Sequence, residues 1–298
     1  REAAADKNHQ ANAQELDAAR KEAMEARTAL LTHSYDFKAI PLWKICWVPT
    51  EGRADWFLET DCFPEASSSK TRVLIWGDSH AAALHPGVKL DEDLKVGLVA
   101  RAICVPTLRA GRGGTGNDET CRESNNNLLS LVEKDPPDIV VLFGAWYHKR
   151  YYGDFRVLLK GVRDLAKEIS KRGVGRVIVA GPTPHWSDDL PKVVYKRWEG
   201  LSPPRRLDAD LRTDAFELDR IMREQSWPRG VEYFSMIDVF CDDEGCLTYV
   251  PNLDELISHN YGHLTVPAAA FAAKAMKLHD KSRGIVSSQN EKKRGGDR

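Results

Sequence analysis

Residues 71–84 read Thr-Arg-Val-Leu-Ile-Trp-Gly-Asp-Ser-His-Ala-Ala-Ala-Leu, an apolar run that stops at Gly77 and is followed by alanines. The apolar run is typical of a buried strand, and the alanines favour a helix. Ser79 therefore lies in a strand-to-helix turn, beside the free N–H groups of a helix N-terminus. Such donors can stabilise the oxyanion of acyl transfer, so we predict that Ser79 is a nucleophile. The alternative is that Asp78 or Ser79 only caps the helix.

Apolar runs like this one recur along the chain and alternate with segments of helical periodicity. That alternation predicts an α/β fold whose parallel sheet is covered by helices on both faces. In such sheets the sites lie at the carboxyl ends of the strands, which is where Ser79 is placed. The predicted strands are 71–76, 96–100, 139–143, 174–180 and 233–240, and the predicted helices are about 123–134, 154–171, 207–226 and 266–279.

Composition excludes several classes of protein. The chain has 298 residues, 42% of them hydrophobic, so it can bury a sizeable core. Its net charge of −1 argues against nucleic acid as the main partner, because phosphate binding needs clustered positive charge. No run of about 18 apolar residues is present, so no membrane span is predicted. The chain starts at Arg1 without a signal peptide, which indicates a piece of a longer protein.

Four segments are predicted from the changes in pattern along the chain. Residues 1–32 lack Gly and Pro and are expected to form a linker helix that buries little by itself. Residues 33–70 are irregular and rich in tryptophan, and we expect them to pack on the main domain, residues 71–281. Residues 282–298 are rich in Ser, Lys and Gly and are predicted to be disordered.

The six cysteines fall into three local pairs. None stands in a Cys-x-x-Cys arrangement, so a zinc site is not expected. Disulfides are favoured over the alternative of six buried thiols, and they would indicate an oxidising compartment. The candidate pairs are Cys46 with Cys62, Cys104 with Cys121, and Cys241 with Cys246.

His263 is the candidate general base for Ser79, since an activated serine needs a base within reach. It lies in Asn260-Tyr-Gly-His-Leu-Thr265, where Thr265 is the predicted cap of the last helix. A histidine in that loop would lie at the same sheet edge as Ser79. With nine histidines in the chain, a surface-loop role is the alternative. The rival bases are His80, His148 and His185.

In their order along the chain, these motifs resemble the SGNH/GDSL hydrolase superfamily. More narrowly, they resemble the SGNH domain fused to acyltransferase family three membrane proteins, bacterial enzymes that O-acetylate surface polysaccharides. The resemblance covers about residues 40–280. The motifs that carry it are Leu74-Ile-Trp-Gly-Asp-Ser-His-Ala81, Ile103-Cys104, Pro136-Pro-Asp-Ile-Val-Val141, Trp146, Gly181-Pro-Thr-Pro184, the Cys241 and Cys246 hairpin and Asn260-x-x-His263-Leu-Thr265.

The resemblance implies an α/β/α sandwich, the SGNH hydrolase fold, with a flavodoxin-like sheet of five parallel strands. It also implies a Ser-His-Asp triad and acetyl transfer that needs no metal or other cofactor. Ser79 would supply one oxyanion N–H, and a second would come from the 104–114 loop. Asp78, His80 and Trp146 are expected to bind substrate. Aromatics that could stack on sugars, or could simply be core or surface residues, are Trp146, Tyr147, Trp186 and Trp198.

The site departs from the family pattern in two places. The family's acid lies three residues before the histidine, where this chain has Asn260. An engineered substitution, a natural dyad in which a backbone carbonyl orients His263, and a degenerate site remain open, and Asp254 or Glu255 are upstream acids with a different spacing. The superfamily's oxyanion Asn is also missing, because Phe143 is followed by Gly-Ala-Trp, a feature that the fused subgroup shares.

The function predicted from this resemblance is O-acetyl transfer, through an acetyl-serine, onto a hydroxyl of a bacterial surface polysaccharide such as lipopolysaccharide. The expected partners are an acetyl donor, a glycan acceptor and an upstream transmembrane acyltransferase domain of the same polypeptide. The expected location is the periplasmic side of an inner-membrane protein. The alternatives are a secreted carbohydrate acetylesterase and an inactive glycan-binding module.

Overall fold

A six-stranded parallel sheet forms the centre of the protein in this computed structural model, which describes residues 2–32, 42–109, 117–146 and 155–280. The strand order is β1-β3-β2-β4-β5-β7, so β2 lies between β3 and β4. The five strands from β3 to β7 follow the flavodoxin-like order that was expected. The strands are β1 (Trp47–Val48), β2 (Thr71–Gly77), β3 (Leu94–Arg101), β4 (Ile139–Phe143), β5 (Arg176–Ala180) and β7 (Val231–Phe234).

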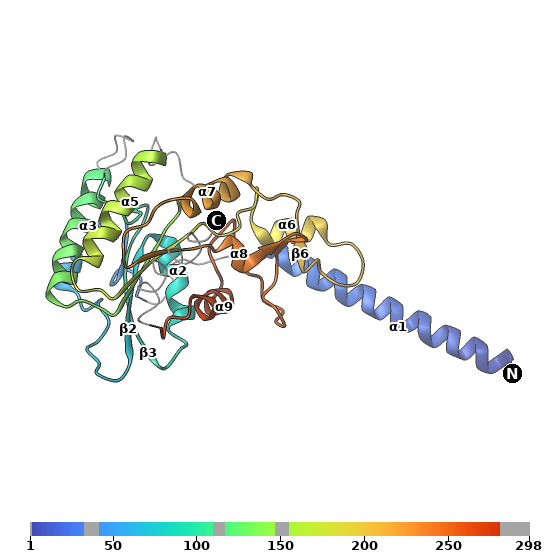
Figure 1. Cartoon of the computed structure of the whole chain (residues 1–298). Coiled ribbons are helices and arrows are strands. Elements are labelled where there is room, and N and C mark those ends of the chain that lie inside the picture. The colour runs from blue at the N-terminus through green and yellow to red at the C-terminus, as the bar shows by residue number, and fades with distance from the viewer. Residues whose placement is uncertain (1, 33–41, 110–116, 147–154, 281–298) are drawn as a thin grey trace, which may run out of the picture.

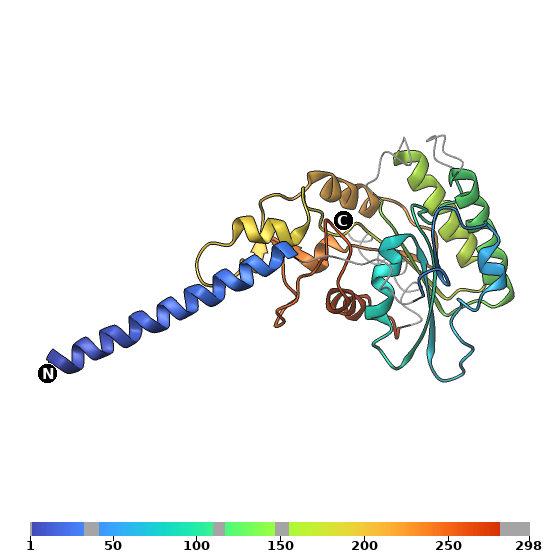
Figure 2. The same ribbon diagram turned by 180° about the vertical axis from the view of Figure 1, so that it is seen from behind.

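Helices cover both faces of the sheet, which confirms the α/β/α arrangement (Figures 1 and 2). α2 and α9 pack together on one face, and α3 and α5 lie on the other. β4 and β5 are buried along their whole length, as strands covered on both faces must be. The helices are α2 (Ser79–Val88), α3 (Asn117–Lys134), α5 (Phe155–Ser170), α7 (Thr213–Arg223) and α9 (Val266–Met276).

The sheet has one strand more than predicted. β1 comes from the irregular segment before residue 71 and pairs in parallel with β3, with Trp47 opposite Ala100. Two residues are too short a run for period-two patterning to reveal. The Arg101 guanidinium reinforces this edge by donating to the carbonyls of Thr50 and Gly52. The segment before residue 71 therefore adds a strand to the core and is held there by buried polar contacts.

The predicted fifth strand, 233–240, was wrong at its carboxyl end. β7 ends at Phe234, and Ile237–Phe240 forms the short helix α8. The cause is local, because the buried Ser235 hydroxyl accepts a hydrogen bond from the Asp238 N–H and turns the chain. α7 is likewise shorter than the predicted 207–226, because residues 206–207 form the strand β6.

A small antiparallel sheet and an additional helix lie beside the main sheet. The predicted hairpin of Cys241 and Cys246 forms two strands of that sheet, whereas its third strand and the helix were not predicted. The sheet has the order β6-β9-β8, and its β8 and β9 are joined by Cys241 and Cys246. The helix begins just after Asp189 with a proline in its first turn, a start signal that the sequence does carry. These elements are α6 (Leu190–Arg197), β6 (Arg206–Leu207), β8 (Cys241–Asp242) and β9 (Gly245–Leu247).

The N-terminal helix α1 (Glu2–Ala29) projects from the body of the protein and meets it near the carboxyl end of the helix (Figures 1 and 2). Arg27 anchors that end by donating to the Tyr195 carbonyl of α6 and by stacking its guanidinium over the Tyr195 ring. Among the residues that the structure describes, no helix is long and apolar enough to cross a membrane.

All three predicted disulfides are present, at sequence separations of 16, 17 and 5 residues. Cys46–Cys62 closes the loop that carries β1, and Cys104–Cys121 joins the loop after β3 to α3. Loop closure of about 15 residues stabilises a fold by roughly 3 kcal/mol through the unfolded chain. The alternative of six free thiols is therefore excluded.

Candidate active site

The turn between β2 and α2 is held by a buried carboxylate. Asp78 caps α2, with Oδ1 accepting from the His80 N–H at 2.9 Å and Oδ2 accepting from the Ala145 N–H at 2.8 Å. Gly77 is required here, because a Cβ atom at that position would lie 1.7 Å from the Phe143 carbonyl oxygen. Asp78 therefore does act as the cap, as the alternative reading of this turn proposed. The Ser79 hydroxyl is not used for capping and is left for another partner.

Asp78 is 1% exposed, and its environment opposes the charge that it carries. Burial raises the pKa of its carboxyl from the ordinary 3.8 to about 6, against hydrogen bonds from Ala145 and His80 that lower it. Its two oxygens bind the turn after β2 to the turn after β4. Asp78, which was expected to bind substrate, is thus a buried side chain that joins two turns at the carboxyl edge of the sheet.

Ser79 and His263, which are 184 residues apart in sequence, are in hydrogen-bond contact. His263 Nε2 lies 2.8 Å from Ser79 Oγ. The histidine is 2% exposed, in the loop that enters α9. That helix begins as predicted, with the Thr265 hydroxyl accepting from the Ala268 N–H at its N-terminus. A base that is fixed within reach of a serine hydroxyl is the geometry of an activated nucleophile.

The Asn260 side chain completes a three-residue relay. Its Oδ1 lies 3.1 Å from His263 Nδ1 and also accepts from the backbone N–H groups of Gly262 and His263, at 3.2 and 3.1 Å. Backbone N–H groups can only donate, so the oxygen of the amide must face them. The same oxygen then requires a proton on Nδ1 of His263, which leaves Nε2 free to accept the Ser79 proton. Asn260 itself orients the histidine, and not a backbone carbonyl.

The surroundings of the relay are tightly packed. The His80 ring stacks on the His263 ring, with centroids 4.3 Å apart and planes 23° apart, and it is 1% exposed. Ser79 is the first residue of α2, and its N–H makes no hydrogen bond to any residue that the structure describes. This N–H is therefore available as a hydrogen-bond donor beside the Ser79 hydroxyl.

A family profile described as "SGNH domain (fused to AT3 domains)" matches residues 46–277, which include the whole relay. The chain belongs to this family. The SGNH fold is also found in solved structures. The periplasmic domain of a lipopolysaccharide acetyltransferase from Salmonella ser. Paratyphi A aligns with a TM-score of 0.62 and 23% identity, over 77% of this chain and 88% of that one.

A carbohydrate acetylesterase family member from Sinorhizobium meliloti aligns less well with this SGNH domain. Its TM-score is 0.43 at 13% identity, over 70% of this chain and 95% of that one. No curated protein sequence matches the chain.

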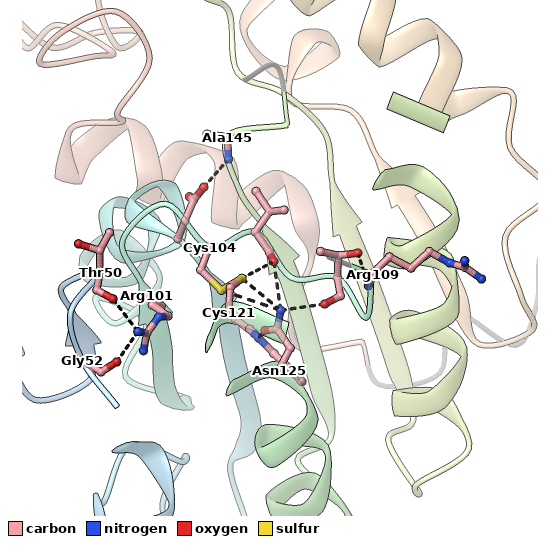
Figure 3. The surroundings of a disulfide bond; sticks show 12 residues. Thr50, Gly52, Arg101, Cys104, Arg109, Cys121, Asn125 and Ala145 are labelled. Atoms are coloured by element: carbon pink, nitrogen blue, oxygen red, sulfur yellow. Dashed lines mark hydrogen bonds between the residues drawn. A yellow bond between two sulfur atoms is a disulfide. The ribbon is translucent and has the colours of Figure 1, made fainter. Parts of the chain in front are cut away.

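The loop after β3 in this SGNH domain is fastened at the catalytic edge by Asn125 of α3, beside the Cys104–Cys121 disulfide (Figure 3). The Asn125 amide donates to the carbonyls of Val105 and Thr107 at 3.2 and 2.9 Å, and its oxygen accepts from Trp76 Nε1 at 2.9 Å. Asn125 was missed from sequence, since it is one of three consecutive asparagines and only burial distinguishes it.

The second oxyanion donor, expected in the 104–114 loop, has no assigned position, because residues 110–116 lie outside the described residues. Tyr147 and His148 lie outside them as well. His185, another rival base, packs against Tyr261 with centroids 4.9 Å apart. The Asp254 side chain is 92% exposed and pairs with Arg205, so it does not replace the missing acid, and Glu255 is also exposed.

The tryptophans expected near the site are buried in the SGNH core. Trp146 is 2% exposed, and its Nε1 donates to the Ala180 carbonyl at 2.7 Å. Trp186 and Trp198 are 1% and 5% exposed. Stacking on a sugar needs an open ring face, so this burial argues against that role for all three. Among the described residues, no group of three His, Cys, Asp or Glu side chains is arranged to bind a metal ion.

Proposed function

We propose that this SGNH domain transfers an acetyl group, through an acetyl-Ser79 intermediate, onto a hydroxyl of a bacterial cell-surface polysaccharide. The observation that carries the proposal is the contact of Ser79 Oγ with His263 Nε2 at 2.8 Å, in a chain of this family. The polysaccharide acceptor is suggested by the name of the Salmonella structural relative, a lipopolysaccharide acetyltransferase.

The reaction proceeds in two displacements. In the first, His263 Nε2 takes the Ser79 proton while Oγ attacks the acetyl carbonyl, and the leaving group departs with that proton. In the second, a sugar hydroxyl gives its proton to His263 and attacks the acetyl-serine, and Ser79 Oγ recovers the proton as it leaves. The Ser79 N–H stabilises the negative oxygen in both tetrahedral intermediates.

Asn260 keeps the relay in the working tautomer but supplies no negative charge to the imidazolium that forms in each step. A carboxylate at this position would stabilise that cation. We therefore infer a competent but slowed enzyme, because orientation is retained while electrostatic stabilisation is weaker. Asp78 acts as a positioning residue, since its carboxylate joins the nucleophile turn to the turn after β4.

We propose an extracytoplasmic location and an upstream transmembrane acyltransferase domain that delivers acetyl groups. The family description, in which such domains are fused to AT3 domains, supports the partner. Three disulfides support an oxidising compartment, since cytosolic thiols are kept reduced. Residues 1–32 would then connect the two domains, with Arg27 fixing the end of the helix on the SGNH side.

The test is peptide mass spectrometry after incubation with 4-nitrophenyl acetate. We expect an acetyl adduct on Ser79, no adduct at that position in Ser79→Ala, and a strongly reduced yield in His263→Ala. Adding an acceptor glycan should shift the acetyl group to the glycan. Release of acetate alone, with the glycan present, would indicate an esterase. A chain that forms no adduct, even as Asn260→Asp, would contradict catalysis and indicate a binding module.

A further inference from the structure

A groove of about 790 Å³ runs between α5 and α7, away from the catalytic relay. Its floor is apolar, formed by Phe155, Leu159, Ile221 and Pro228. Its rim is basic, and the only acid among its lining residues is Asp164. Asp164 already pairs with Arg109 at 3.1 Å. The basic residues that line the groove are Arg156, Lys160, Arg163, Lys167 and Arg229.

Four of these cations follow one face of α5, at spacings of four, three and four residues. No hydrogen bond or ion pair joins the side chains of Lys160, Arg163 or Lys167 to any residue that the structure describes. Arg163 is half-buried, and its Nε is fully covered without an acceptor. Arg163 therefore carries a charge that no described acid neutralises, beside the apolar floor of a basic groove.

The direction of α5 shows which end of the groove lies closer to the relay of Ser79, His263 and Asn260. α5 begins after the loop that leaves the carboxyl end of β4, and it ends before the start of β5. Arg156 therefore lies toward the catalytic edge of the sheet and Lys167 toward the opposite edge. The row from Arg156 to Lys167 is about 16 Å long at 1.5 Å per residue. A chain-like ligand that occupies the row would extend toward the edge that carries Ser79.

We propose that this groove binds a linear glycan bearing anionic groups, as the extended part of the acceptor for acetyl transfer. The proposal rests on the proposed function for the identity of the acceptor. The cations of Lys160, Arg163 and Lys167 attract the acidic groups, and the apolar floor receives the faces of the sugar rings. A concave site with a half-buried Arg163 favours a polymer over a flat membrane surface, which could not reach that guanidinium.

The position of the groove agrees with this choice of ligand. α5 lies at the end of the body remote from the projecting N-terminus of α1 (Figures 1 and 2). If an upstream membrane domain joins at that N-terminus, α5 lies at the end of the body remote from the bilayer, where a surface polysaccharide can approach.

The test measures binding of the full chain, as Ser79→Ala to prevent turnover, to polygalacturonate by isothermal titration calorimetry. We expect binding that weakens steeply between 50 and 500 mM salt and no binding to neutral dextran. Lys160→Gln/Lys167→Gln should weaken the affinity at least about ten-fold, because both are exposed and their loss leaves the fold intact. Arg163→Gln should do the same. The matched control is Lys70→Gln/Lys95→Gln. It removes the same charge near the amino-terminal ends of β2 and β3, outside the groove, and should bind as the parent does.

Three results would overturn the proposal: equal binding of dextran, equal loss in the control variant, or unchanged affinity in both groove variants. Binding to phosphatidylglycerol vesicles but not to polygalacturonate, lost in the same variants, would instead make the groove a membrane contact and also refute the proposal. Glycan binding without any acetyl adduct on Ser79 would refute the proposed function and leave the groove assignment standing.

Discussion

Asn260 shows how one uncharged side chain can preserve the geometry of a triad without its charge. Its Oδ1 accepts two backbone N–H groups and faces His263 Nδ1, so the amide cannot rotate without losing those bonds. In serine proteases the equivalent Asp→Asn change is severe, partly because it allows the wrong histidine tautomer. Here the backbone enforces the working tautomer, so the penalty should be smaller.

Asn260→Asp is therefore expected to raise kcat/KM for 4-nitrophenyl acetate by about ten- to a hundred-fold, because a carboxylate stabilises the imidazolium. Asn260→Ala, the matched control, should lower it, because Nδ1 loses its acceptor. Both are read from initial rates, with circular dichroism to verify folding. An Asp variant no faster than the parent would show that charge at this position does not limit the reaction.

Asp78 should make stability depend on pH in an unusual direction. Its pKa is raised from 3.8 to about 6 by burial, so the folded state binds more protons than the unfolded state between these values. Stability from this group is present at pH 4 and falls as pH rises through 6, by roughly 3 kcal/mol in all. Urea unfolding of the parent and of Asp78→Asn at pH 4 to 7 should show the parent losing that advantage.

Asp188→Asn is the control for that measurement. Hydrogen bonds from the Asp189 N–H and from Lys196 lower the Asp188 pKa to about 2, so its protonation lies below the tested range. The difference between the parent and this variant should stay nearly constant from pH 4 to 7. A parent that gains stability relative to Asp78→Asn as pH rises would contradict the raised pKa.

At the scale of elements, the carboxyl edge of the sheet depends on hydrogen bonds and a disulfide between neighbouring segments. Asn125 of α3 holds two carbonyls of the loop after β3, and Trp76 of β2 donates to its oxygen. The Cys104–Cys121 disulfide fastens the same loop to the same helix. Buried hydrogen bonds and a disulfide from α3 thus hold the start of the loop in which the second oxyanion donor is expected (Figure 3).

Asn125→Ala should cost about 3 kcal/mol, because it leaves two carbonyls and one indole N–H buried without partners. The rate of acyl transfer should fall as well, since the loop loses its support. Asn126→Ala, one residue along on the exposed side of α3, should change stability by less than about 0.5 kcal/mol. Chemical denaturation curves measure both, and equal effects would show that the Asn125 contacts add nothing.

At the scale of the whole molecule, sequence patterns predicted the elements with strong periodicity better than those defined by long-range contacts. The buried strands β2, β4 and β5 were found, because continuous apolar runs mark strands covered on both faces. The edge strand β1 and the strand β6 were not, whereas the hairpin of β8 and β9 was indicated by its two cysteines. β1 and β6 have only two residues each and depend on their partner strands, so the local sequence pattern does not reveal them.

The residues of the candidate site likewise fall into those that sequence motifs indicate and those that only packing reveals. Ser79, His263 and Asn260 could be selected from motif order, because a strand-to-helix turn and the entry to the last helix meet at one sheet edge. Trp146 could not be assigned from sequence, since an indole in the core and one at a binding surface look alike until burial is known. Asn125 likewise depends on packing of α3 against a loop that precedes it in the chain.

The sequence by itself determined the parallel α/β sheet, the nucleophile turn and the three cysteine pairs, because period, turn chemistry and short separations are local properties. Only the tertiary structure decided which atom orients His263, because a side-chain oxygen and a backbone carbonyl compete in space. The tertiary structure also decided where positively charged side chains lie together without acidic partners. A net charge of −1 averages over the chain, whereas folding places Lys160, Arg163 and Lys167 in a groove beside α7, without acidic partners among the described residues.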